Sequence, residues 1–178
     1  MASVVFLRGI NVGGANRCKP ATLAKQLAKF DIVNIGAVGT FVVRKDVAEP
    51  VLRKKLAIQL AKDFGIKCEI MIVPARDVLQ LASTDPFAPQ PGGEQFTRFV
   101  SVLHKRPVKL PALPLNLPSD KDWLLKIVAM PNRFILGIYR REMKAIGYLG
   151  KIEKIFEMPA TTRSWTTIQK VFDALKRN

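Results

Sequence analysis

Residues 49–64, with the sequence EPVLRKKLAIQLAKDF, decide how the first half of the chain folds. The large apolar residues of this stretch recur every fourth position, which is typical of the buried face of an α-helix: Leu52, Leu56, Leu60 and Phe64. Gly65 follows, and glycine commonly occupies the left-handed position just after a helix. The stretch therefore predicts an amphipathic helix that ends at residue 64.

Working outward from this helix, β-prone runs flank it and a second helix precedes it. Val4 to Leu7 is apolar without a break and predicts a buried strand. Pro20 suits the first turn of a helix. Residues 32–35, 40–43 and 66–73 predict three further strands. Residues 1–84 therefore predict the order β-α-β-β-α-β, a ferredoxin-like α+β subdomain.

Residues 94–178 predict a second, smaller α+β subdomain that consists of a mixed β-sheet and helices. We expect this subdomain to pack closely on the first subdomain. Strands are expected over 96–103, 124–129 and 134–139, and a last helix from Trp165. Residues 107–118 are rich in proline and predict an extended connection that packs its leucines. The PALP sequence at 111–114 matches the proline-rich motif of SH3 ligands, but such short matches are frequent by chance.

The composition is that of a globular protein with a large excess of positive charge. The chain has 48% hydrophobic residues and no apolar run near the roughly 20 residues that a membrane span needs. It carries 29 Lys and Arg against 14 Asp and Glu, a formal net charge of +15. This favours an anionic partner such as nucleic acid, although solubility or a basic proteome would give the same balance. The excess is spread along the chain, without a basic arm or an aromatic-basic module.

Cysteine and histidine are scarce, which limits the chemistry available. Cys18 and Cys68 are too few for a disulfide framework, and no secretory signal is visible, so we expect a cytoplasmic protein. His104 is the single histidine, and the acidic residues are scattered, so we expect neither a metal site nor a cofactor. Cys18, between Arg17 and Lys19, has flanking charges that lower a thiol pKa, but a buried, inert thiol is favoured.

The loop after the first strand, Arg8-Gly9-Ile10-Asn11-Val12-Gly13-Gly14, is the first candidate site. Backbone N–H groups between a strand and a helix can bind a phosphate or carboxylate. Ala15 and Asn16 stand where a P-loop needs Lys and Ser or Thr, and the glycines do not form GxGxxG. A tight turn with a salt-bridged Arg8 is an equally good interpretation.

The second candidate is the stretch 161–167, TTRSWTT. Ser164 suits the N-cap of the last helix, and a helix N-terminus attracts anions. A capped helix anchored by Trp165 accounts for the same residues without a ligand. Arg163 favours a ligand, because an arginine beside the positive end of a helix dipole needs an anion to offset it.

Several motifs resemble those of a bacterial family known as domain of unknown function 1697. Residues 6–14, FLRGINVGG, resemble the family's LLRGINVGG start, and residues 159–167, PATTRSWTT, its PATTRNWNT element. Asp85-Pro86-Phe87 is similar to its NPF turn. Val38-Gly39-Thr40 departs from the family's SGN turn, Ser164 and Thr166 replace asparagines, and residues 144–148 replace a serine-lysine element.

The resemblance implies a two-part α+β fold in which the two ends of the chain supply one polar region, and it assigns no activity. We therefore expect Arg8, Asn11 and Arg163 to converge. The ligand-binding residues expected from the motifs are Arg8, Gly9, Asn11, Gly13, Gly14, Asn16, Lys19, Arg163, Ser164, Trp165 and Thr167.

Three functions remain open on these observations. The first is binding of an anionic ligand, either nucleic acid or a phosphorylated metabolite. The second is a small enzyme acting on a phosphorylated or carboxylated metabolite. The third is a structural or assembly role without a ligand. The sequence does not decide whether the protein is catalytic, and it leaves its oligomeric state open.

Overall fold

The computed structural model describes residues 1–14, 16–83, 85–119 and 122–177, and these form two units. Unit 1 consists of Met1–Ala82 with Gln169–Asn178, and unit 2 of Ser83–Ile168. The last ten residues, expected with the second half, thus group with the first unit. Both units are mixed α+β with an antiparallel sheet, which confirms the predicted fold class.

Unit 1 is built on a four-stranded antiparallel sheet in the order β2-β3-β1-β4. Its elements follow the predicted order along the chain: β1 (Ser3–Leu7), α1 (Pro20–Gln26), β2 (Ile32–Asn34), β3 (Thr40–Val43), α2 (Glu49–Phe64), β4 (Ile70–Pro74) and α3 (Ala75–Ser83). The central β1 pairs with β3 on one side and β4 on the other. The β-α-β-β-α-β order predicted from residues 1–84 is therefore present.

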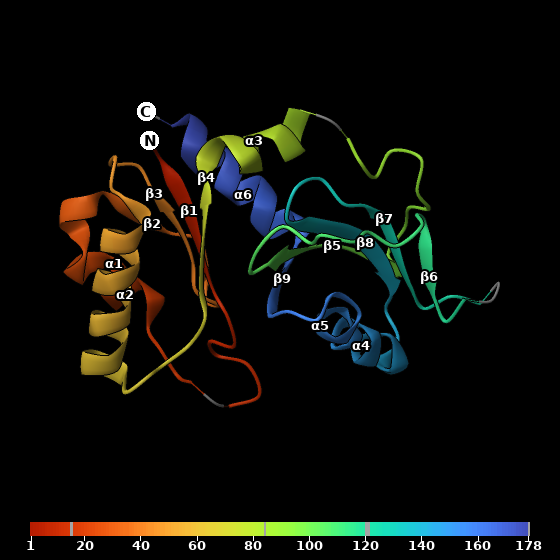
Figure 1. The fold of residues 1–178 in the computed structure, drawn as a ribbon, viewed down its shortest axis with the longest axis horizontal. Helices are drawn as coiled ribbons and strands as arrows, with labels where there is room; N and C mark the ends of the chain where they lie inside the picture. The colour runs from red at the N-terminus through yellow and green to blue at the C-terminus, as the bar shows by residue number, and fades with distance from the viewer. Residues whose placement is uncertain (15, 84, 120–121, 178) are drawn as a thin grey trace. The chain divides into compact units, whose positions relative to one another are not determined.

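One face of this sheet packs against α1 and α2 (Figure 1). Leu52, Leu56 and Leu60 are fully buried there, as the spacing predicted, and Gly65 ends α2 with a φ of 64°. Phe41 is also buried in this cluster. Nucleic-acid-binding sheets of this topology need exposed aromatic rings, and the side chains of β1 and β3 on both faces of the sheet are buried.

Unit 2 is built on a five-stranded antiparallel sheet in the order β6-β7-β8-β5-β9. Its elements are β5 (Phe96–Leu103), β6 (Leu115–Leu117), β7 (Leu125–Ala129), β8 (Phe134–Arg140), α4 (Met143–Leu149), α5 (Lys151–Phe156), β9 (Ala160–Ser164) and the start of α6 (Trp165–Lys176). The helices α4 and α5 cover one face of the sheet, where Ile152 and Phe156 pack on Phe99 and Ile127 (Figure 1).

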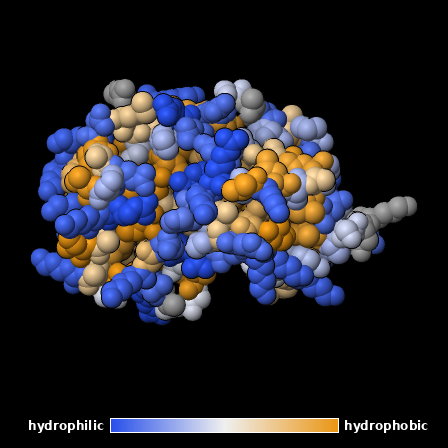
Figure 2. Space-filling view, in the orientation of Figure 1, coloured by the Kyte–Doolittle hydropathy of each residue, from blue (hydrophilic) through white to orange (hydrophobic). Residues whose placement is uncertain are grey.

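Sequence reasoning missed β6, β9, α4 and α5. The stretch 161–167 reads as a loop and a helix cap, yet Thr161, Thr162 and Arg163 form an edge strand paired with β5. The proline-rich connection also differs from expectation, because Val108, Leu110 and Leu113 are exposed and only Leu115 and Leu117 pack on the core. In Figure 2, hydrophobic residues (orange) lie next to hydrophilic residues (blue) on the visible surface.

Candidate functional site

The loop that follows β1 makes an unusual series of left-handed backbone turns. Positive φ angles occur at Gly9, Asn11, Gly13, Gly14 and Asn16. Glycine and asparagine are the residues that adopt this region most readily, which explains their density here. Gly13 and Gly14 have open space where a Cβ would stand, so their peptide groups can be approached closely.

The amide side chain of Asn11 fixes this loop in place. Its Nδ2 donates to the carbonyl oxygen of Cys18 at 2.9 Å and to that of Ala37 at 2.6 Å. Its Oδ1 accepts from the Cys18 backbone N–H at 2.9 Å. Ala37 lies in the β2–β3 turn, directly before the Val38-Gly39-Thr40 stretch that corresponds to the family's SGN turn. Asn11 thus ties the loop to the β2–β3 turn, and its role in the described structure is to position the loop.

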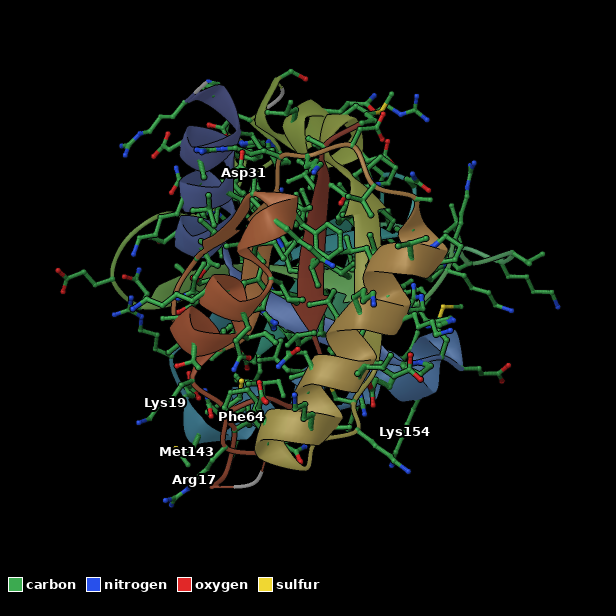
Figure 3. All side chains as sticks on the ribbon, turned by 90° about the vertical axis from the view of Figure 1, so that its left-hand side faces the viewer. Arg17, Lys19, Asp31, Phe64, Met143 and Lys154 are labelled. Carbon is green, nitrogen blue, oxygen red and sulfur yellow. The ribbon has the colours of Figure 1, made fainter. Side chains whose placement is uncertain are left out.

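The exposed cations of the loop are Arg8, Arg17 and Lys19. Figure 3 shows Arg17 and Lys19 extending outward at the end of unit 1 that carries Phe64. The backbone N–H of Arg8 donates to the carbonyl oxygen of Glu69 at 3.0 Å, which fixes the start of the loop while its side chain remains exposed. The sequence of residues 8–19 contains no acidic residue. The loop itself therefore contributes only positive charge, and the acidic residue beside it is Glu69.

The two cysteines beside this loop are poor nucleophiles. Cys18 is buried, and its burial raises the pKa of the thiol. Burial, followed by the nearby Cys18 and Glu69, raises the pKa of the Cys68 thiol to about 11. The lowered pKa suggested by Arg17 and Lys19 is thus wrong for Cys18, because desolvation outweighs the flanking charges. The favoured interpretation, a buried thiol, is confirmed.

The second candidate stretch, in unit 2, turns from β9 into α6. Ser164 caps the helix, since its Oγ accepts from the Thr167 backbone N–H at 3.2 Å and lies 3.0 Å from the Thr167 Oγ1. Arg163 is buried, and its Nη1 donates to the Thr161 hydroxyl at 2.8 Å and to the Thr162 carbonyl oxygen at 2.9 Å. Burial lowers the pKa of Arg163 to about 10, so the guanidinium stays charged at neutral pH.

The turn at Asp85-Pro86-Phe87 meets this second stretch. The Phe87 ring is fully buried and packs edge-on against Trp165, with 5.1 Å between ring centroids. The Asp85 carboxylate accepts from the Phe87 backbone N–H at 3.1 Å and shapes the turn. Two motifs of the family resemblance therefore come together within unit 2.

Sequence reasoning found no aromatic-basic module along the chain and missed a cationic sheet face in unit 2. Arg98 and Lys126 both lie opposite Ile138, Arg140 is two residues further along β8, and Arg163 pairs with Val100. Because side chains alternate along a strand, all four cations point to one face, opposite α4 and α5. Only the strand register could have revealed it, because these residues are far apart in sequence.

Three other kinds of feature can indicate a function: a cavity, a metal site and a membrane-spanning helix. A cavity of about 180 Å³ near the start of β1 is lined by Asp46 and Glu49, and it contains none of the expected site residues. Within the described ranges, no cluster of three His, Cys, Asp or Glu side chains is placed to hold a metal ion. Among these same residues, no helix combines the length and apolar composition that a membrane crossing needs.

The motifs therefore form two groups, one in each unit. Arg8, Gly9, Asn11, Gly13, Gly14, Asn16 and Lys19 belong to the loop of unit 1, and Arg163, Ser164, Trp165 and Thr167 to the β9–α6 turn of unit 2. The convergence of Arg8, Asn11 and Arg163 in one pocket stays a prediction.

These features define a two-unit α+β protein with a glycine-rich cationic loop after its first strand. The chain belongs to the family described as protein of unknown function (DUF1697), whose model matches residues 1–121. This match includes the loop and the Asp85-Pro86-Phe87 turn, while the β9–α6 stretch lies beyond it.

The fold is similar to that of the conserved bacterial protein SP0830 from Streptococcus pneumoniae. The TM-score is 0.64 over 98% of both chains, at 15% sequence identity. A search of curated proteins found no relative.

Proposed function

We propose that the protein binds a phosphate-bearing anion at the loop of residues 8–19. The observation that carries the proposal is a loop without acidic residues in which the side chains of Arg8, Arg17 and Lys19 are exposed. The Asn11 amide bonds the loop to Cys18 and to Ala37, which lowers the cost of ordering these residues when a ligand binds. The phosphate belongs either to a nucleic acid or to a small metabolite, and both share this chemistry.

The loop supplies both parts of a phosphate site. Cationic side chains attract the charge, and backbone N–H groups beside exposed glycines can approach an anion closely. Asn11 acts as a positioning residue in this proposal, because its amide is engaged with Cys18 and Ala37. Arg163 acts within its own strand and turn, and its contribution to the same ligand requires the convergence expected from the sequence.

Thermal stabilisation by inorganic tripolyphosphate tests the loop. A ligand that binds only the folded protein raises its melting temperature, by an amount that grows with ligand concentration. We expect a shift for the wild type that is absent in Arg8→Ala and in the triple variant Arg8→Gln, Arg17→Gln and Lys19→Gln. The matched control, Lys54→Gln, Lys55→Gln and Lys62→Gln, removes the same charge from exposed positions of α2 and should keep the shift.

The outcomes separate the two sources of phosphate. A shift with tripolyphosphate indicates a small phosphorylated ligand, whereas binding of a 12-nucleotide oligonucleotide without that shift indicates a nucleic acid. Equal shifts in wild type and loop variant would remove the loop from the function. Destabilisation of Arg8→Ala without any ligand effect to lose would favour a structural role.

A further inference from the structure

The cationic face of the second sheet is a separate site from the loop. The five strands of this sheet contain four basic residues and no acidic one, and the register places all four on one face: Arg98, Lys126, Arg140 and Arg163. Arg163 is buried, whereas Arg98, Lys126 and Arg140 are half-buried, so these three are the cations that an anion can reach. An anion beside them would meet positive charge without a facing carboxylate on the strands of this sheet.

Aromatic rings hold three of these cations in position. Arg98 lies over the Phe87 ring, with its guanidinium carbon 5.6 Å from the ring centroid. Lys126 lies over the Trp123 ring at 4.6 Å, and Arg140 lies 5.3 Å from the same ring. Such contacts restrict long side chains that would otherwise lose entropy when a ligand binds.

Arg140 is held by a hydrogen bond as well as by aromatic rings. Its Nε donates to the Trp123 carbonyl oxygen at 2.9 Å, and its guanidinium also lies 6.0 Å from the Phe96 ring. Phe96 stacks on Trp123 with 5.8 Å between centroids. Arg98, Lys126 and Arg140 are each half-buried, and none of them forms an ion pair with a carboxylate in the described part of the chain.

The spacing of the cations favours a chain of phosphates over a single one. Arg98 and Lys126 lie in one row on either side of β8, so their backbones are two strand spacings, about 10 Å, apart. Arg140 follows one further row along the sheet. Three fixed cations spread over this distance match successive phosphates of one strand.

We propose that Arg98, Lys126 and Arg140 bind the backbone of a single-stranded nucleic acid across this face. A single strand is favoured over a duplex because Phe96 is only half-buried beside Arg140, and an unpaired base can stack on a ring or a guanidinium plane. This proposal does not depend on the loop of residues 8–19, since it names different residues in a different unit.

Fluorescence anisotropy with a labelled 20-nucleotide poly(dT) strand, measured across a salt series, tests the site. Each phosphate contact on a single strand contributes about 0.7 to the slope of log K against log salt. The face variant Arg98→Gln, Lys126→Gln and Arg140→Gln should therefore lower the slope by about 2. The same three lost contacts weaken binding about 100-fold at 0.1 M salt.

Three further variants complete the test. The matched control Lys144→Gln, Lys151→Gln and Lys154→Gln removes the same charge from exposed positions of α4 and α5 and should leave the slope unchanged. Arg98→Lys with Arg140→Lys should keep the slope, because charge is retained. Lys126→Gln alone, which removes no hydrogen bond of its own side chain, should lower the slope by about 0.7 and covers the case in which the triple variant does not fold.

The proposal is overturned if the face variant binds like the wild type, or if the α4–α5 control loses as much. Equal or tighter binding of a duplex of the same length would overturn the assignment to a single strand. The loop variant Arg8→Gln, Arg17→Gln and Lys19→Gln should keep the part of the salt slope that the cationic face contributes. Failure of one site is therefore distinguishable from failure of the other.

Discussion

Replacing Asn11 by alanine tests whether one amide holds the candidate loop in place. The substitution removes three hydrogen bonds, to the Cys18 carbonyl oxygen, the Cys18 N–H and the Ala37 carbonyl oxygen. At about 1 kcal/mol each, and with water replacing part of them at this partly exposed position, the loss is about 2 kcal/mol. Alanine at a φ of 55° adds about 1 kcal/mol.

The expected total is therefore about 3 kcal/mol, which for a protein of this size lowers the melting temperature by roughly 6–12 °C. Urea unfolding measures the free energy, and hydrogen exchange gives a local readout at the Cys18 amide, whose protection should fall. Asn11→Gly should recover about 1 kcal/mol, because glycine adopts the left-handed region at no steric cost.

Asn16→Ala is the matched control for this prediction. Asn16 has a similar φ of 48°, but its side chain makes a single exposed hydrogen bond, of 3.2 Å, to the Gly9 carbonyl oxygen. It should lose only about 1.5 kcal/mol, mostly from backbone conformation. If Asn11→Ala is no more destabilised than Asn16→Ala, the amide does not hold the loop and the reasoning fails.

Three further predictions test the structure elsewhere. Gly137→Ala should cost about 2–3 kcal/mol in urea unfolding, because the new Cβ would lie 2.5 Å from the Phe99 ring, whereas Gly147→Ala in α4 meets no atom within 4 Å and should be neutral or stabilising; equal effects would contradict the packing. Ser164→Ala should cost about 1 kcal/mol through loss of the α6 cap and Thr166→Ala less than 0.5, and a reversed order would refute the cap. Cys68 should react slowly with thiol reagents in the native state, and because its folded pKa is raised to about 11, the stability that it contributes is present below about pH 9 and lost as pH rises toward 11. The difference in alkaline stability between wild type and Cys68→Ala isolates this effect, and a difference that does not change with pH would contradict it.

The order of elements in unit 1 could be predicted because its signals are local. Leu52, Leu56 and Leu60 lie on one helical face, and Val4 to Leu7, the buried residues before Arg8, are all apolar. The role of Asn11 could not be predicted, since its partner Ala37 is 26 residues away and only the fold brings the β2–β3 turn beside the loop.

The second unit was harder to predict, because its features depend on strand pairing. Thr161 and Thr162 carry no strong strand signal beyond their β-branched side chains, and β9 forms because β5 offers a free edge. The cations Arg98, Lys126 and Arg140 appear unrelated along the chain. They share a face only because β5, β8 and β7 pair in one register.

The most direct test of anion binding is the salt dependence of oligonucleotide binding by the unmodified protein. Anisotropy of a labelled poly(dT) strand should give a dissociation constant that rises steeply from 50 to 200 mM salt. Three contacts at the cationic face alone predict a slope of log K against log salt of about −2. A dissociation constant that is insensitive to salt, or no binding at 50 mM salt, would contradict nucleic-acid binding at the cationic face.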